Sequence, residues 1–168
     1  EHCLYLTTQD YTQALTWYWK AAEQGDAIAQ TNIGYLYHKG LGVSQNYTEV
    51  MIWYQMATKQ ADAIAQASIG YLYHKGLGMS QDYAEVMIWY WMATEQGDAI
   101  AQNNISYLYQ EGLGVSQDYA EVMVWYWKAA EQGHATSQHN IGYLYENGLG
   151  VIKDKSKASR WYKKAVEQ

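Results

Sequence analysis

The chain has 168 residues, of which 49% are apolar and 17% are charged, and this composition excludes a disordered chain. Phe and Pro are absent, so 18 Tyr and 8 Trp must supply the aromatic packing. The formal net charge is −6, and the main basic cluster lies between residues 153 and 164. Because phosphate binding needs a basic stripe over the working surface, no nucleic-acid partner is expected. The cluster is interpreted as a polar cap of the array, with a binding patch as the alternative.

The sequence does not determine the cellular compartment of the protein. It contains no apolar run of about 18 residues, so no membrane span is expected and the protein is predicted to be soluble. Cys3 is the single cysteine, which excludes an intrachain disulfide. The chain begins at Glu1, without Met and partway through a repeat, so we expect a truncated N-terminus from which a signal peptide could have been removed or left out.

A 36-residue period runs through the chain. It is carried by a Gly-Leu-Gly triplet and by five Trp-Tyr pairs, which begin at Trp17, Trp53, Trp89, Trp125 and Trp161. A fixed period of this length is typical of repeat proteins, whose units are stabilised by stacking on their neighbours. We predict a single repeat domain over residues 1–168, made of a partial repeat, 1–26, and four full repeats, 27–62, 63–98, 99–134 and 135–168.

Each full repeat predicts two helices, here called the A helix and the B helix. In the first full repeat the A helix carries an apolar stripe at Ala29, Ile33, Leu36 and Tyr37 and is expected to end at Gly40. Gly residues within the A helices, at positions 34, 70 and 142, predict close approach of a neighbouring helix, which would compensate for their low helix propensity.

The B helix begins at a predicted capping box. Asn46, Asp82 and Asp118 each lie three residues before a Glu, so Glu49, Glu85 and Glu121 are interpreted as capping groups. The inward stripe of the first B helix is Val50, Trp53, Tyr54 and Ala57. Gly97 and Gly133 end later copies, while Ala61 fills the same place less favourably.

The repeat resembles a known family. Its clearest copy, residues 105–133, reads ISYLYQEGLGVSQDYAEVMVWYWKAAEQG and is similar to the SEL-one-like repeat (SLR) family, a relative of the tetratricopeptide repeats. The resemblance covers residues 10–168. It implies an all-α fold, a right-handed superhelical α-solenoid of antiparallel helix pairs with 36-residue repeats and a concave face lined by A helices. It also implies an adaptor that holds other proteins together.

One Tyr in each A helix marks the leading candidate site. These residues, Tyr35, Tyr71, Tyr107 and Tyr143, are flanked by polar positions that differ between copies. The flanking candidates are Thr31, His38, His74, Asn103, Gln110, His139 and Glu146. A Tyr row with exchangeable polar neighbours is typical of a surface that binds a peptide or a protein. The alternative is that the Tyr row packs against adjacent A helices.

A second aromatic row follows the Trp-Tyr pairs at Trp19, Trp91 and Trp127, and is interrupted by Gln55 and Lys163. Because Trp91 is rotated by about 100° from the core stripe, it is expected to be partly exposed. The row is interpreted as packing between repeats. The alternative is an outer surface that stacks on sugars or on a partner.

Catalysis finds no support in the sequence. The repeated Glu residues lie a full repeat apart and cannot pair for acid and base chemistry. Since helices pack about 8–10 Å apart, His38 and His74 should not share a metal ion. A phosphate at the Gly-Leu-Gly loops is disfavoured because Asp82, Asp118 and Asp154 occupy the helix starts that follow. No catalytic residue, metal or cofactor is therefore expected.

The sequence thus predicts a non-enzymatic scaffold or adaptor that binds a peptide or protein on its A-helix surface. The alternative is a carbohydrate-binding or cell-wall-associated repeat module that uses exposed Tyr and Trp. Because the partial first repeat should expose the apolar side of Trp17 and Ala21, self-association through that end is also predicted.

Overall fold

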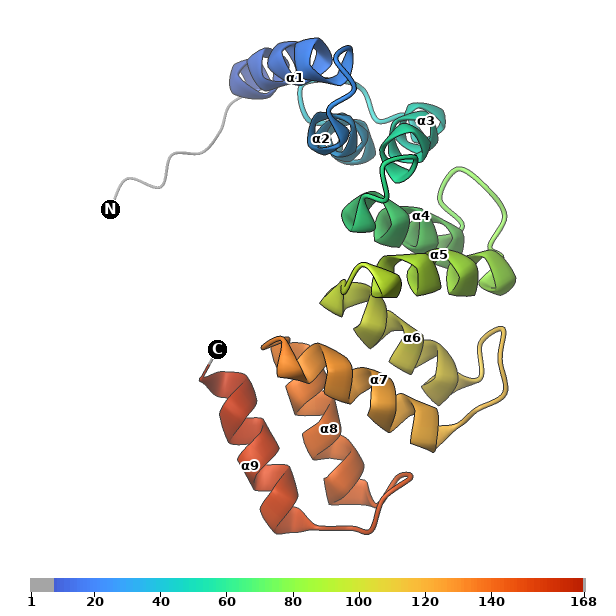
Figure 1. Ribbon diagram of the computed structural model, residues 1–168, viewed down its shortest axis with the longest axis vertical. Coiled ribbons are helices and arrows are strands. Elements are labelled where there is room, and N and C mark those ends of the chain that lie inside the picture. Colours follow the sequence, from blue (N-terminus) through green and yellow to red (C-terminus); the bar gives the residue numbers. More distant parts are fainter. Residues whose placement is uncertain (1–7, 168) are drawn as a thin grey trace. The chain divides into compact units, whose positions relative to one another are not determined.

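The computed structural model describes residues 8–167, which form helices joined by short loops and contain no β-strand (Figure 1). This part of the chain holds nine helices: α1 (Thr8–Ala22), α2 (Ala27–Lys39), α3 (Tyr47–Thr58), α4 (Ala63–Lys75), α5 (Tyr83–Glu95), α6 (Ala99–Glu111), α7 (Tyr119–Glu131), α8 (Ala135–Asn147) and α9 (Lys155–Val166). The predicted all-α fold of helix pairs is confirmed. Cys3 and residues 1–7 of the predicted partial repeat lie outside the described residues.

The chain divides into two compact units, residues 1–81 and 82–168, which we call the N-terminal unit and the C-terminal unit. The N-terminal unit contains α1 to α4, and α2 pairs with α3 as A helix and B helix. The C-terminal unit contains α5 to α9, with α6 paired to α7 and α8 paired to α9. The organisation of the whole chain as one repeat domain stays a prediction.

The A helices end as the sequence predicts. Gly40 follows α2 with a φ of 66°, and its N–H donates to the Leu36 carbonyl, which closes the helix in a left-handed cap. The starts of the A helices are capped by residues that are not predicted as caps from the sequence. Asp26 accepts from the Ala29 N–H at 2.7 Å. The same position is filled by Asp62, Asp98 and His134 in the later repeats.

The B helices start with half of the predicted capping box. Asp118 Oδ1 accepts from the backbone N–H groups of Ala120 and Glu121, so the cap itself is confirmed. The return bond is not formed, because the Asp118 N–H donates to the Tyr109 carbonyl at 3.1 Å. Glu121 Oε2 accepts instead from Trp125 Nε1 at 3.1 Å. The interpretation of Glu121 as a capping group is therefore wrong.

Glu85 follows the same pattern, since its carboxylate accepts from Trp89 Nε1 at 3.1 Å. The spacing of three residues that suggests a capping box also places each Glu four residues before a Trp. On a helix that second spacing brings the two side chains together on one face.

Close packing of A and B helices explains the Gly residues within the A helices. A Cβ added at Gly34 would lie 2.5 Å from Cε1 of Tyr54, and one added at Gly142 would lie 2.7 Å from Cδ1 of Tyr162. In α6 the position is Ser106, which is fully buried and donates its hydroxyl to the Val122 carbonyl at 2.7 Å. The predicted close approach is confirmed at Gly34 and Gly142.

Hydrogen bonds join two successive repeats at the start of α4. In the N-terminal unit, Thr31 Oγ1 donates to Asp62 Oδ1 at 3.1 Å, and Gln60 Nε2 donates to the Gly25 carbonyl at 2.6 Å. Asp62 therefore caps α4 and ties it to α2 at the same time. Ala61, directly before this cap, has a φ of 56°, which agrees with the expectation that Gly would fit better there.

Candidate functional site

The predicted Tyr row lies on the surface of the A helices. The exposed fractions of Tyr35, Tyr71, Tyr107 and Tyr143 are 47%, 42%, 41% and 45%. The following residue in each helix, such as Leu36 after Tyr35, is buried at 4% or less. The Tyr rings therefore point away from the core of their own hairpins.

A row of exposed Ile accompanies the Tyr row. Ile28, Ile64 and Ile100 are 69%, 63% and 58% exposed and lie seven residues before a Tyr of the row. Seven residues correspond to about two helical turns, so each Ile shares a face with its Tyr. This row is not among the sites predicted from the sequence, although the spacing between Ile28 and Tyr35 indicates it. In the last repeat the position is Thr136.

The N-terminal unit has a hollow between its A helices. Its volume is about 240 Å³, and its walls are Ile28, Thr31, Asn32, Tyr35, Tyr54, Asp62, Ile64 and Ser68. Burial raises the pKa of Tyr54 to about 12, and its hydroxyl hydrogen-bonds with Ser68. The hollow therefore combines exposed Ile and Tyr side chains with a phenol that stays protonated at neutral pH.

Two of the predicted flanking residues join repeats. Thr31 is only 7% exposed, and its hydroxyl is bonded to Asp62. Asn103 Oδ1 accepts from the Ser137 hydroxyl at 3.0 Å in the C-terminal unit. A helical projection of one helix places both residues beside the Tyr row, but it does not show the first turn of the following A helix, where Thr31 binds the cap residue Asp62 and Asn103 binds Ser137.

Two others accept hydrogen bonds from Tyr hydroxyls of their own hairpins. Tyr126 donates to Gln110 Oε1 at 3.4 Å, and Tyr162 donates to Glu146 Oε2 at 2.6 Å. Glu146 is nevertheless exposed, so its second oxygen faces the surface.

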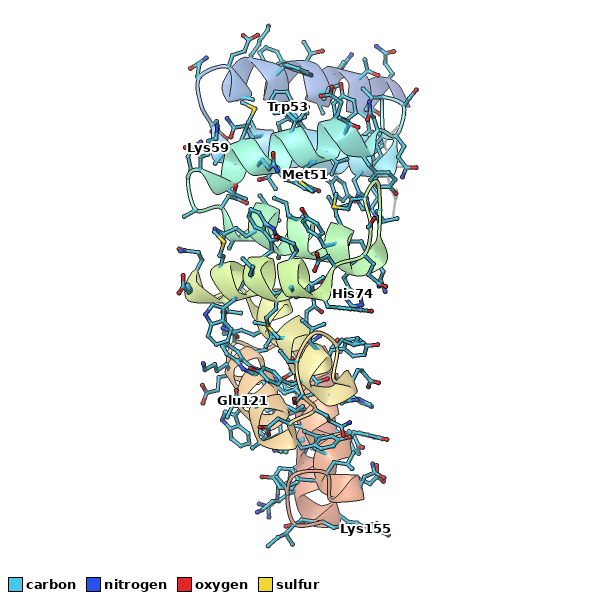
Figure 2. The ribbon with its side chains drawn as sticks, turned by 90° about the vertical axis from the view of Figure 1, so that its right-hand side faces the viewer. Met51, Trp53, Lys59, His74, Glu121 and Lys155 are labelled. Carbon is cyan, nitrogen blue, oxygen red and sulfur yellow. The ribbon has the colours of Figure 1, made fainter. Side chains whose placement is uncertain are left out.

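The His candidates differ in their surroundings. The His38 ring lies 5.8 Å from the Tyr47 ring and 6.1 Å from the Tyr71 ring, so it bridges α2 and α4. Burial, with a smaller effect of the adjacent Lys, lowers the pKa of both His38 and His74, so both are neutral at neutral pH. His74 lies at the C-terminal end of α4 (Figure 2).

His139 is exposed and lies 5.0 Å from the Tyr162 ring. This pair lines a second, almost wholly apolar hollow of about 530 Å³ between α8 and α9 in the C-terminal unit. The hollow corresponds in part to that of the N-terminal unit, since His139 and Tyr162 are the repeat equivalents of Thr31 and Tyr54.

The predicted Trp row packs between repeats and stays partly exposed. Trp19, Trp91 and Trp127 lie edge-on to Trp53, Trp125 and Trp161, with ring centroids 4.6, 4.9 and 4.8 Å apart. Figure 2 shows Trp53 between α1 and α3. The expected packing between repeats is observed, and 37%, 44% and 38% of the respective side chains of the row remain exposed.

Trp17 has no equivalent neighbour before it among the described residues and is 68% exposed, with the Lys20 ammonium 4.5 Å from its ring centroid. Its exposure agrees with the expectation, while self-association through this end stays a prediction. The carbohydrate-binding alternative also stays a prediction, which a titration of Trp fluorescence with oligosaccharides would test.

Among residues 8–167, no group of three or more His, Cys, Asp or Glu side chains could hold a metal ion. No helix in the same range combines the length and apolar character needed to cross a membrane.

Comparison with known families identifies the repeat. The Sel1 repeat family model matches residues 4–26, 27–62, 63–98, 99–134 and 135–168. The chain belongs to the Sel1 repeat family. Sel1 repeats generally act as protein–protein interaction modules and non-catalytic scaffolds.

Solved Sel1 structures share the fold. A Sel1 repeat protein from Oxalobacter formigenes is 37% identical, with a TM-score of 0.89 over 94% of this chain. A protective antigen present in uropathogenic Escherichia coli strains, which displays an SLR fold, is also 37% identical, with a TM-score of 0.87 over 95% of this chain. A Sel1 repeat protein from Klebsiella pneumoniae is 22% identical, with a TM-score of 0.68. The match covers 91% of this chain and 73% of the Klebsiella chain, and it supports the fold alone.

This chain spans 64% of the Oxalobacter protein and 34% of the Escherichia coli antigen. A comparison with curated proteins gives no significant match.

Proposed function

We propose that this Sel1 repeat chain is a non-enzymatic scaffold that binds a peptide or protein segment on the A-helix surface. The single observation that carries the proposal is the hollow between α2 and α4, whose walls include the exposed Ile28 and Tyr35 of one repeat and the exposed Ile64 of the next. Tyr offers a large contact area at a low cost in rotamer entropy, and exposed apolar groups beside polar walls are typical of peptide-binding grooves.

The charged groups at the ends of the A helices should give each unit a preference for peptide segments of one charge. In the N-terminal unit the last turns carry Lys39 and Lys75, and the Lys39 ammonium lies 6.0 Å from the Tyr35 ring centroid. In the C-terminal unit the corresponding ends carry Glu111 and Glu146. Charge complementarity steers association and suppresses wrong partners. An acidic segment should therefore prefer the N-terminal unit, and a basic segment the C-terminal unit.

The test uses two matched double variants and a panel of labelled peptides that share aromatic and apolar residues but differ in charge. Tyr35→Ala with Tyr71→Ala should abolish binding of the acidic peptides, measured by fluorescence anisotropy. Tyr107→Ala with Tyr143→Ala should leave that binding within about twofold. Circular dichroism should show unchanged helicity for both variants, because all four rings are over 40% exposed.

Two results would contradict the proposal. Loss of helicity in the Tyr variants would mean that the rings belong to the core. Unchanged binding in both double variants would mean that the partner binds elsewhere on the chain.

A further inference from the structure

The hairpin of α8 and α9 leaves uncovered a face that is buried in the hairpin before it. Tyr126 and Ala130 of α7 are 2% and 1% exposed, because they pack against the next A helix, α8. The equivalent residues of α9 are Tyr162, which is partly exposed, and Val166, which is 86% exposed. Both line the apolar hollow of about 530 Å³, together with His139. This hollow therefore lies where α8 lies at the junction of α7 with α8.

His139 occupies a position that binds the first turn of the following A helix in other repeats. Thr31 donates to Asp62, the cap of α4, at 3.1 Å. Asn103 accepts from the Ser137 hydroxyl, in the first turn of α8, at 3.0 Å. The imidazole of His139 can donate to a carboxylate at the start of a helix in the same way as the Thr31 hydroxyl does.

Tyr162 also occupies a position that binds the following A helix. The Tyr54 hydroxyl hydrogen-bonds with Ser68 of α4, and the Tyr126 hydroxyl hydrogen-bonds with Asn140 of α8. The Tyr162 hydroxyl donates to a Glu of its own hairpin and lines the hollow. The hollow thus carries both side chains that hold a helix at the junctions within each unit.

The start of α9 differs from the start of α7. Tyr119 and Met123 of α7 pack against a core that α7 shares with α8. Their equivalents on α9 are Lys155 and Ser159, and both are exposed. The face is therefore polar near the start of α9 and apolar near its end.

The position of Lys155 predicts which end of a bound helix would lie beside it. The loop after α8 lies on the start of α7, since a Cβ added at Gly150 would be 2.5 Å from the Tyr119 Cβ. Lys155, labelled in Figure 2, takes the place of Tyr119 on α9. A helix that enters the hollow in the orientation of α8 therefore brings its C-terminal end to Lys155. A cation there favours the negative end of the helix dipole and a carboxylate in the last turn.

We infer that the hollow binds one amphipathic helix of a partner protein. The helix begins with an Asp cap beside His139, fills the hollow with small and apolar residues, and ends with a carboxylate beside Lys155. A second copy of the chain is a poor source of such a helix, because its A helices are packed against B helices of their own chain over the described residues. The site contains no Tyr of the row, so this inference goes beyond the peptide-binding surface proposed above.

The test is fluorescence anisotropy of a labelled peptide with the sequence of residues 98–111, acetylated and amidated at its ends. This sequence begins with Asp98, carries Asn104 at the position equivalent to Asn140, and ends with Glu111. Because the peptide must fold as it binds, a dissociation constant of about 100 µM is expected. The Glu111→Lys peptide should bind about fivefold more weakly, because its cation meets Lys155.

Two matched variants of the chain locate the site. Ala165→Glu should weaken binding at least about tenfold, because it places a charge in the apolar hollow that Ala165 lines. Ser156→Glu is the control, since it adds the same charge at an exposed residue of the same helix and should leave binding within about twofold. Circular dichroism should show equal helicity for both. Tyr107→Ala with Tyr143→Ala should also retain binding, which separates this site from the Tyr row.

A charge reversal tests the orientation of the bound helix. Lys155→Glu should reverse the order of the two peptides, so that the Glu111→Lys peptide binds more tightly. Lys164→Glu is the control and should keep the original order, because the Lys164 ammonium lies over the Trp161 ring, 4.9 Å from its centroid.

Three results would overturn the inference. The first is no binding of the 98–111 peptide at chain concentrations up to about 1 mM, which is tenfold above the expected dissociation constant. The second is an equal loss of binding in Ser156→Glu and Ala165→Glu. The third is a dimer of the chain that Ala165→Glu abolishes in sedimentation equilibrium, since the face would then bind a second copy.

Discussion

The hairpins α2–α3 and α6–α7 are equivalent parts of two repeats and show how one packing problem is solved in two ways. In α2–α3 the ring of Tyr54 lies against the bare backbone of Gly34, where a Cβ would be 2.5 Å away. In α6–α7 the same position is Ser106, and its buried hydroxyl is bonded to the Val122 carbonyl. The comparison teaches that this contact tolerates a small side chain when the polar atom it brings in finds a partner.

The same two hairpins differ at the Glu and Trp of the B helix. Trp125 Nε1 donates to Glu121, whereas Trp53 Nε1 is buried and has no hydrogen-bond partner, although Glu49 lies at the equivalent position. The sequences of the two hairpins are nearly equal, yet the indole N–H of Trp125 has a hydrogen-bond acceptor and that of Trp53 has none. The difference makes the two hairpins internal controls for each other.

The largest expected effect comes from filling the close contact. Gly34→Val should lower the free energy of unfolding by about 3 kcal/mol, because a branched side chain must displace the buried Tyr54 ring. Gly34→Ser should cost much less, since Ser106 shows an arrangement that accepts this residue. Chemical denaturation of both variants measures the difference. Equal losses would mean that the two hairpins do not adapt in the same way.

A smaller effect should separate the two Glu residues. Glu121→Ala should lower the free energy of unfolding by about 1.5 kcal/mol, because it leaves the Trp125 N–H without its acceptor. Glu49→Ala should cost about 0.5 kcal/mol, the value of a carboxylate in the first turn of a helix, since Trp53 loses no bond. Urea denaturation of the two variants gives the comparison. A loss for Glu49→Ala as large as that for Glu121→Ala would show that Glu49 bonds to Trp53 in solution.

The N-terminal cap of α8 should make the stability of this A helix depend on pH in a way that the caps of the other A helices do not. His134 replaces the Asp of the other repeats, and its Nδ1 accepts from the Ser137 N–H at 3.3 Å. Burial lowers the pKa of His134 below its ordinary value of 6.5, and nearby Asp98 partly opposes this shift. The unfolded chain therefore takes up the proton first, so stability is present above about pH 6.5 and is lost as the pH falls below it.

His134→Asp should accordingly stabilise the chain by about 1 kcal/mol at pH 5 and by less at pH 8, because an ionised Asp still accepts the hydrogen bond at the lower pH. Thermal or urea unfolding at the two pH values measures this gain. The contributions of His38 and His74 are common to both proteins and cancel in the comparison. A gain that is the same at pH 5 and pH 8 would mean that His134 does not titrate between the folded and unfolded states.

The smallest expected effect concerns the exposed Ile row. Ile100→Thr should change the free energy of unfolding by less than about 0.5 kcal/mol, because the side chain is 58% exposed. Ile105→Thr is the matched control on the same helix. Ile105 is fully buried, and its substitution should cost at least about 2 kcal/mol by placing a hydroxyl in the core. Similar losses for the two variants would show that the Ile100 side chain is packed.

The sequence predicts the hairpins well because their determinants are local. The apolar stripe of Ile33 and Leu36, the stop at Gly40 and the cap at Asp118 each act within a few residues of the chain. Such features repeat in every copy and can be read from spacing alone.

The candidate surface is predicted less completely because it depends on neighbours that are distant in the sequence. Thr31 lies beside the Tyr row on its own helix, but Asp62, 31 residues away, takes up its hydroxyl. The role of Glu121 is mistaken because one spacing fits both a capping box and a bond to Trp125. The Ile row goes unnoticed because Ile28 lies in the first helical turn, before the stripe from which the helix is recognised.

The bonds of Asp62 at the start of α4 bear on how such an array changes length in evolution. The cap of α4, Asp62, serves its own helix and Thr31 of the previous repeat, so one short junction contains both partners. Repeats 27–62 and 63–98 are identical at 28 of 36 positions, so unequal recombination between their coding segments would insert or delete a whole hairpin. Each new junction would keep the Asp cap of its A helix, but only a junction that follows Thr31 would keep the bond between repeats, because Ala67 replaces this Thr in the next copy. Copy number can therefore change in steps of 36 residues, while the hydrogen bond between repeats depends on which copy is duplicated.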